Sequence, residues 1–362
     1  MKTKVILNFR NLYSSLFTFL RKKHMKNFVR KQKKSYTKAN VLTSKQKKEI
    51  VNFYKEYKKV PTLFHNFYTE KTGEYHVNYI TDEMYFNDIN YYFNDFAAFK
   101  FIDNKTNYDK LFPKINQPKI LVSRKNGYWF IQDEIVSVDK AIEILLNEPA
   151  VFVKRATDCG GASGVFYVEN QTEEQFRRDF LLKVKKIPTD IAVQKLVVQH
   201  QDVAKLNPDS VNTVRILTIL QRDGTAKVYS SLLRIGGGKE KVDNFCAGGM
   251  AVGIDDDGSL REYGYYLNGN RITAHPLTKI AFKGYYVPSI EKAKELVKQA
   301  HVYVPHFRMV SWDVAIEKDG TPILIEANLA DGQLDLHQLC NGPLFKEDTK
   351  KILDEVYNKR GE

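Results

Sequence analysis

One hairpin near the carboxyl end, spanning residues 311–328, constrains the fold of this chain more than any other segment. Two apolar runs flank the dipeptide Asp319-Gly320, which strongly favours a tight turn between paired strands. Because side chains alternate between the two faces of a strand, the position of the turn determines which residues oppose one another. The segment therefore predicts an antiparallel pair with a defined register.

Folding the strands back from this turn places two carboxylates opposite each other. Val314 then faces Ile325, and Asp313 faces Glu326. Asn328 shares the face of Glu326 because it lies two residues further on. Opposed like charges destabilise a sheet unless positive charge lies between them, and Mg²⁺ accepts carboxylate and amide oxygens as ligands. The hairpin is either a Mg²⁺ site made of these three side chains or an edge hairpin with solvated charges.

The net charge of +13 is concentrated in one part of the chain. Residues 1–48 contain 15 lysines and arginines and no acidic residue, which leaves 41 basic residues against 43 acidic ones in the remainder. This arm begins with an apolar stripe at helical spacing, formed by Val5, Phe9, Leu12, Leu16 and Leu20. Polar residues interrupt the stripe, and no small-residue cleavage site follows it, so neither a membrane span nor a signal peptide is expected.

A basic amphipathic helix of this kind suits an anionic membrane surface, which predicts a peripheral association through residues 1–38. The alternative is a helix that packs on the body or on a partner and is followed by a solvated basic linker. Nucleic-acid binding is not favoured, because the arm lacks a groove-reading motif and the body has no basic excess. Three distant cysteines without metal or redox spacing indicate a reducing, cytoplasmic location: Cys159, Cys246 and Cys340.

Strand-like and helix-like segments are mixed along the chain without strict alternation, which predicts an α+β fold rather than a doubly wound parallel sheet. We expect a basic amphipathic arm at 1–40 and a small, mainly helical domain at 41–110. A subdomain with a lysine and a glycine-rich loop is expected at 111–200, and a subdomain with the Mg²⁺ site at 201–362.

An apolar strand at residues 151–155 ends in Lys154 and Arg155 and leads into a loop rich in glycine and serine. Glycine lets backbone N–H groups approach phosphate oxygens closely, and a nearby lysine balances the charge. The loop lacks the Gly-Lys-Ser/Thr ending of a Walker loop. It is either a phosphate-binding loop or a hairpin without a ligand, and its key members are Gly160, Gly161, Ser163 and Gly164.

Three further segments have a functional and a structural interpretation. Gln194, Lys195 and Leu196 lie in a strand that either contacts an adenine edge or is simply amphipathic. Arg215 and Arg234 interrupt apolar runs, so each needs a buried carboxylate or a phosphate as its partner. A polar pair before Gly248-Gly249 lines a substrate pocket or forms a turn, and its members are Asp243 and Asn244.

The order of these features resembles the ATP-grasp superfamily and, more specifically, the sugar-transfer-associated ATP-grasp proteins of polysaccharide biosynthesis. The likeness spans about residues 105–345 and is carried by the segments 210–215, 233–236, 242–249, 312–313 and 325–328. Two positions depart from the family pattern: Gln194 is often Glu, and Arg155 stands where many members have Pro.

The resemblance implies two α+β subdomains that clasp ATP. It assigns adenine and phosphate contacts to Lys154, Gly160, Gly161, Ser163, Gly164, Gln194, Lys195 and Leu196. An earlier lysine completes this set, with Lys110 as the first choice and Lys105 or Lys100 as alternatives. Mg²⁺ is assigned to Asp313, Glu326 and Asn328, and the transferring phosphoryl group to Arg215, Arg234 and Lys154. Substrate contacts are expected from Asn212, Asp243 and Asn244.

The implied activity is an ADP-forming carboxylate–amine ligase that works through an acyl phosphate. It would modify a sugar or sugar acid, possibly lipid-linked, for a cell-surface polysaccharide such as a capsule, at the inner membrane face. A sugar kinase on the same fold and a non-catalytic ATP-binding scaffold are the alternatives.

Overall fold

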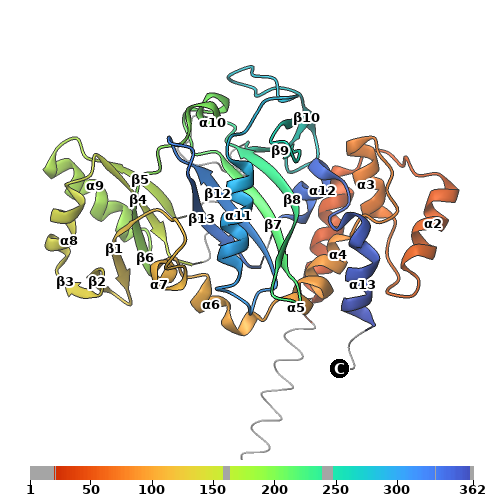
Figure 1. Cartoon of the computed structure of the whole chain (residues 1–362), viewed down its shortest axis with the longest axis horizontal. Helices are drawn as coiled ribbons and strands as arrows, with labels where there is room; N and C mark the ends of the chain where they lie inside the picture. The colour runs from red at the N-terminus through yellow and green to blue at the C-terminus, as the bar shows by residue number, and fades with distance from the viewer. Residues whose placement is uncertain (1–19, 21, 158–163, 239–247, 331, 359–362) are drawn as a thin grey trace, which may run out of the picture. The chain divides into compact units, whose positions relative to one another are not determined.

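The computed structural model describes residues 20, 22–157, 164–238, 248–330 and 332–358 (Figure 1). Contacts divide the chain into two units, and each is described by itself. One unit contains the described residues up to Phe93 together with those from Gly342 onward, and the other spans Asn94–Asn341. The N-terminal part of the first unit therefore ends at Phe93, before the predicted boundary at residue 110. The described residues from Gly342 onward also belong to this unit.

The first unit consists of helices and their connections. They are a helix over residues 22–36, α2 (Ser44–Tyr54), α3 (Leu63–Thr72), α4 (Asp82–Met84), a π-helical turn (Tyr85–Ile89), α5 (Asn90–Phe93), a 3₁₀ turn (Lys346–Asp348) and α13 (Thr349–Tyr357). Helix α2 begins with a capping box, in which Thr43 and Gln46 each accept a hydrogen bond from the backbone of the other.

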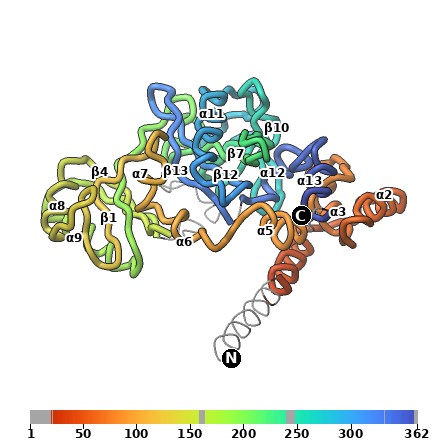
Figure 2. Tube along the Cα trace, turned by 60° about the horizontal axis from the view of Figure 1, so that its bottom comes forward, coloured from red at the N-terminus to blue at the C-terminus, as the bar shows by residue number. Residues whose placement is uncertain are grey.

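Helix α13 lies beside the N-terminal helices of this unit (Figure 2), and side-chain hydrogen bonds join it to the N-terminal segment. The Tyr57 hydroxyl donates to Asp354 at 2.9 Å, and the Tyr357 hydroxyl donates to Asp88 at 2.8 Å. These pairs are almost 300 residues apart in sequence, so no local pattern could have revealed them. None of the helices in the described ranges has the length and apolar composition that crossing a bilayer requires.

The second unit contains two antiparallel sheets, which confirms the predicted α+β class. The six-stranded sheet has the order β3-β2-β1-β6-β4-β5. Its elements are β1 (Ile120–Lys125), β2 (Tyr128–Ile131), β3 (Glu134–Val136), α8 (Val138–Leu145), β4 (Ala150–Arg155), β5 (Val165–Glu169), α9 (Glu173–Lys185) and β6 (Ile191–Lys195). Helices α8 and α9 share one apolar core with the sheet (Figure 1).

The seven-stranded sheet has the order β11-β10-β9-β8-β7-β12-β13. Its strands are β7 (Thr213–Leu220), β8 (Ala226–Ile235), β9 (Met250–Ile254), β10 (Leu260–Tyr265), β11 (Arg271–Ile272), β12 (Met309–Ile316) and β13 (Pro322–Asn328). The other elements of this unit are a 3₁₀ turn (Phe96–Ala98), α6 (Phe99–Ile102), a second 3₁₀ turn (Lys105–Asn107), α7 (Tyr108–Leu111), α10 (Gln201–Leu206), α11 (Ile290–His301) and α12 (Leu334–Asn341).

Strands β12 and β13 form the predicted hairpin. The opposition of Asp313 and Glu326 is confirmed, but Val314 pairs with Leu324 and not with Ile325. A β-bulge causes this difference, because the extra residue in β13 shifts the register between these two pairs. The bulge keeps Leu324 and Ala327 in the apolar core while Glu326 stays beside Asp313.

Helix α11 packs on one face of the seven-stranded sheet and forms the main core with it. Alternate strand residues such as Val214, Val310 and Trp312 meet Ala293 and Val297 of the helix in this core. Because strand side chains alternate, the residues between them lie on the opposite face. The polar residues singled out in the sequence occupy that second face.

Candidate functional site

Arg215 lies between Val214 and Ile216, which both belong to the α11-side core, so its side chain projects from the other face of the sheet. Strand β7 pairs with β12 so that Arg215 opposes Asp313 directly. Strand β8 pairs with β7 so that Arg234 lies opposite Thr213, two residues before Arg215 and on the same face. Cross-strand register therefore brings two arginines and one aspartate together from three strands.

Asp313 is the centre of this cluster. Arg215 Nε donates to its Oδ1 at 2.8 Å and Arg215 Nη2 to its Oδ2 at 2.7 Å, a bidentate fork. Arg234 Nη1 and Asn328 Nδ2 also donate to Oδ2, at 2.7 and 3.3 Å. Burial alone would raise the pKa of Asp313, but the two guanidinium groups outweigh it and lower the pKa to about 2.

Glu326, which faces Asp313, has its own cation. The Lys105 amine donates to Glu326 Oε1 at 2.6 Å, and this lysine is buried although it comes from a short 3₁₀ turn. The positive charge that the hairpin was predicted to need is thus supplied by Arg215, Arg234 and Lys105. The 28% exposure of the Glu326 side chain leaves part of its carboxylate accessible.

The first-choice lysine of the sequence analysis lies elsewhere. Lys110 pairs with Asp133 at 2.5 Å, and these two side chains are 67% and 73% exposed. Lys100 is exposed on α6. The turn that buries Lys105 beside Glu326 is followed by α7, whose outer side carries Lys110. The structure therefore places Lys105, one of the two alternatives, beside Glu326, and Lys110 beside Asp133.

We tested whether the predicted metal ligands fit a hard divalent cation. Asp313 Oδ2 accepts three donors, but Oδ1 accepts one and keeps a lone pair. The second carboxylate oxygen of Glu326 and the amide oxygen of Asn328 complete a set of oxygen ligands, which Mg²⁺ prefers. The residues fit an ion whose remaining ligands are phosphate oxygens and water. No cluster of three or more His, Cys, Asp or Glu side chains suited to a metal occurs among the described residues.

The six-stranded sheet also has one face free of its covering helices. Val151, Val153 and Val193 face α8 and α9, so Lys154 and Gln194 lie on the opposite face. Gln194 is buried, and its Oε1 has no hydrogen-bond partner among the described residues. An unsatisfied buried acceptor of this kind fits a ligand N–H group.

Lys195 and Leu196, the residues after Gln194, were also predicted to contact the nucleotide. Lys195 is exposed and its amine pairs with Glu148 at 3.1 Å, so its side chain is directed away from the face of Gln194. Leu196 follows the end of β6 and is partly buried. Both residues therefore offer backbone groups more readily than side chains to a ligand beside Gln194.

The two sheets are joined close to these residues. The Lys105 backbone N–H donates to the carbonyl of Ala156 at 2.9 Å, which is two residues beyond Lys154. Gly164 has a φ of +89° and its carbonyl accepts from the Arg155 N–H at 2.7 Å, so it anchors the end of the glycine-rich loop. Five predicted site residues lie outside the described residues: Gly160, Gly161, Ser163, Asp243 and Asn244.

Asn212, predicted to contact substrate, forms hydrogen bonds within the protein through its side chain. It is buried, and its amide donates to the carbonyls of Val203 at 2.9 Å and Asn207 at 3.0 Å. Its Oδ1 accepts from the Gly236 N–H at 3.4 Å. The side chain therefore bonds to the loop before β7. A polar residue is needed there because the backbone groups of a buried loop require hydrogen-bond partners.

Gly236 ends β8 in a space that a side chain would overfill. A Cβ there would lie 2.5 Å from Ser210 Oγ and 2.6 Å from Asn207 Nδ2, and Asn207 also donates to the Gly236 carbonyl at 2.9 Å. We expect Gly236→Ala to lower the free energy of unfolding by about 1–3 kcal/mol, measured by urea denaturation. Gly238→Ala is the control, because a Cβ at Gly238 meets no atom of the described residues within 4 Å. Equal losses in both variants would contradict the overpacking argument.

Two residues close to Arg215 and its strand neighbours, Gln333 and His337, escaped the sequence analysis. Arg215 Nη1 donates to Gln333 Oε1, and Gln333 has a left-handed φ of +54°. His337 of α12 contacts the hydroxyls of Ser230 at 2.8 Å and Ser311 at 3.3 Å. Their proximity to the end of β13 was the one available signal, since α12 follows the hairpin directly.

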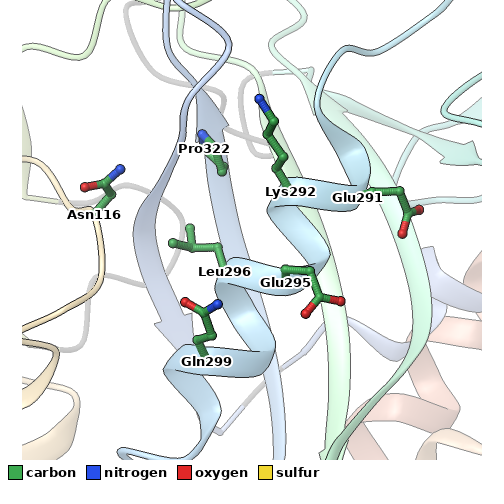
Figure 3. A pocket seen from close by; sticks show the side chains of 7 residues that line it. All are labelled: Asn116, Glu291, Lys292, Glu295, Leu296, Gln299 and Pro322. Carbon is green, nitrogen blue, oxygen red and sulfur yellow. The ribbon is translucent and has the colours of Figure 1, made fainter.

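A cavity of about 340 Å³ lies away from these residues. It is lined by Leu296 and Gln299 of α11 and by Pro322 at the start of β13 (Figure 3). Because α11 covers the apolar face of the sheet, this cavity is separated from the face that carries Asp313. It contains none of the predicted site residues.

Comparison with known proteins identifies the superfamily first. The match is to an ATP-grasp model, described as sugar-transfer associated ATP-grasp, over residues 87–354. The chain belongs to this family, which confirms the resemblance and the ATP-grasp fold. No curated protein matched the chain.

Several solved structures are similar at low identity. The biotin carboxylase domain of 2-oxoglutarate carboxylase from Hydrogenobacter thermophilus, in complex with MgADP, ADP and bicarbonate, has 11% identity and a TM-score of 0.43, covering 72% of this chain and 46% of that one. D-alanyl-alanine synthetase A from Vibrio cholerae has 16% identity and a TM-score of 0.40, covering 70% and 64%. D-alanine–D-alanine ligase from Bacillus anthracis has 13% identity and a TM-score of 0.39, covering 73% and 68%. The chain thus spans less than two thirds of the first two.

Proposed function

We propose that the protein is an ATP-dependent, ADP-forming ligase that joins a carboxylate to an amine during the modification of a sugar or sugar acid for a cell-surface polysaccharide. The observation that carries the proposal is the acidic pair Asp313 and Glu326, held between Arg215, Arg234 and Lys105 on one sheet face. Membership of the sugar-transfer-associated ATP-grasp family supports the link to sugars.

Each side chain has a defined task in this reaction. Glu326 and Asn328, with Oδ1 of Asp313, would hold Mg²⁺, which neutralises phosphate charge when bound. Lys154 and Lys105 contact phosphate oxygens, and the buried Gln194 acceptor receives a hydrogen bond from the adenine amino group. These contacts orient the nucleotide before any bond changes.

Arg215 and Arg234 stabilise the negative charge that develops on the transferring phosphoryl group. A substrate carboxylate attacks the γ-phosphorus, and ADP leaves. The amine then attacks the resulting acyl phosphate, forms the amide and releases phosphate. Planar guanidinium forks suit both the phosphoryl group and the carboxylate that receives it.

Product analysis tests the reaction class. Purified protein with ATP, Mg²⁺ and panels of sugar acids, amino sugars and amino acids should release ADP and free phosphate in equal amounts, and only when a carboxylate and an amine are both present. Mass spectrometry should then find a product joined by loss of water. A product heavier by one phosphoryl group, without free phosphate, would instead establish a sugar kinase. Nucleotide binding without turnover on any pair would support a scaffold.

The acidic pair gives a sharper prediction. We expect Glu326→Gln to reduce ATP turnover by about 10²–10³-fold, because the amide loses the charge that attracts the cation. The melting temperature should fall, because the amide oxygen still accepts from Lys105 but no longer balances its buried charge, so turnover is compared at a temperature at which both proteins are folded. Glu317→Gln is the matched control, because Glu317 lies in the same hairpin beyond β12. Turnover that is unchanged in Glu326→Gln, or equally reduced in both variants, would remove Glu326 from the site.

A further inference from the structure

The helix over residues 22–36 belongs to the first unit (Figure 2). Two of its basic side chains form ion pairs with that unit. Lys33 is fully buried, and its amine lies 3.3 Å from Asp82 Oδ2 and 4.6 Å from the ring centroid of Phe67. Arg30 forms a fork with Glu83, with Nη2 to Oε2 at 3.0 Å. Asp82 and Glu83 are buried at the start of α4. The second half of the basic arm is thus docked, unlike the solvated linker that the sequence also allowed.

The opposite side of this helix is exposed. Successive residues rotate by roughly 100°, so Lys23, Asn27, Lys31 and Lys34 lie on the side away from Val29 and Lys33. The three lysines of this side are all exposed. Large apolar side chains lie among them, with Phe28 54% exposed and Leu20 53% exposed.

We propose that this outer face of helix 22–36 docks on a membrane surface that contains anionic lipids. Three exposed lysines on this face, with no acidic residue anywhere in residues 1–48, complement the negative charge of such a surface. Phe28 and Leu20 can enter the headgroup region, while lysine amines stay with the phosphates. The proposal is independent of the reaction catalysed by the second unit.

The ion pairs of Lys33 and Arg30 fix the orientation of the helix and therefore of its exposed side. A flexible basic arm would bind a membrane without orienting the protein. Lys33 and Arg30 instead hold the helix by the side that carries Val29, so Lys23, Lys31 and Lys34 face outward together. Association through this face would therefore bring the first unit to the membrane in one orientation.

Sedimentation with vesicles tests the proposal on the full chain. We expect binding to vesicles of phosphatidylcholine with 30% phosphatidylglycerol, none to pure phosphatidylcholine, and weaker binding at high salt. Each lysine near such a surface strengthens binding roughly fivefold, so replacing Lys23, Lys31 and Lys34 by Glu should weaken it by at least two orders of magnitude. Arg30 and Lys33 remain intact in this variant, and its melting curve should match that of the wild type.

The control variant replaces three lysines that are exposed elsewhere by Glu and has the same net charge: Lys114, Lys185 and Lys318. It should bind anionic vesicles nearly as well as the wild type. Equal weakening in the two variants would show that net charge alone acts and would overturn the proposal. Wild-type protein that ignores anionic vesicles, or prefers RNA to them in competition, would overturn it as well. Phe28→Ser should weaken vesicle binding without changing its salt dependence.

Discussion

Replacing Asp313 by alanine is expected to destabilise the protein by about 3–5 kcal/mol and to abolish ATP turnover. The loss arises because two buried guanidinium groups, those of Arg215 and Arg234, are left without their carboxylate. Urea denaturation would measure the free energy of unfolding, and release of ADP would measure turnover.

Asp319→Ala is the matched control, because Asp319 lies in the same hairpin but is exposed at its turn. Its cost should stay near 1 kcal/mol. A second variant separates the ion pair from the reaction. Arg215→Met combined with Asp313→Ala should be less destabilised than the sum of the single changes, because it also removes one of the two uncompensated charges. Strict additivity would contradict the coupling described for Asp313.

Acid is expected to weaken the fold well above the range in which carboxylates titrate. Burial lowers the pKa of His65 and of His301 to about 4, and burial together with Arg215 lowers that of His337 to about 3. The unfolded chain takes up protons near pH 6.5, whereas these folded side chains do not. Stability is therefore complete above pH 6.5 and falls as the pH drops towards 4, by about 3 kcal/mol for each of these histidines.

His301 shows why the neutral form is required. Its Nε2 donates to the carbonyl of Phe307 at 2.8 Å, so its Nδ1 accepts from the Thr218 hydroxyl at 2.7 Å. The indole N–H of Trp312 donates to the same hydroxyl at 2.7 Å. With a proton on Nδ1, both His301 and Trp312 would point a donor at the Thr218 hydroxyl, in a core that excludes water.

We expect His301→Gln to be less stable than the wild type at pH 7 but to lose about 3 kcal/mol less between pH 6.5 and 4. Denaturation followed by fluorescence, to which Trp312 contributes, would measure both values. His24→Gln is the control, because His24 is exposed and should leave the pH dependence unchanged. An identical pH dependence in all three proteins would show that His301 is not the group that resists protonation.

Local chemistry predicted much of the hairpin correctly. The turn at Asp319-Gly320 determined the opposition of Asp313 and Glu326, because a tight turn leaves little freedom in register. The bulge at Ile325 could not be anticipated, since a bulge depends on how β13 packs against the core. The choice between Lys105 and Lys110 had the same limit, because short 3₁₀ and helical turns have no apolar periodicity that sets which side faces inward.

The sequence by itself determined which groups needed a partner. It showed that Arg215 and Arg234 interrupt buried strands, that Asp313 and Glu326 repel each other, and that positive charge had to come between them. Only the tertiary structure decided the partners, because Asp313 lies 98 residues from Arg215 and 79 residues from Arg234 in the sequence. The same holds for the basic arm: its charge is written in residues 1–48, but the acids that hold Lys33 and Arg30 lie about 50 residues away and meet them only in the folded unit.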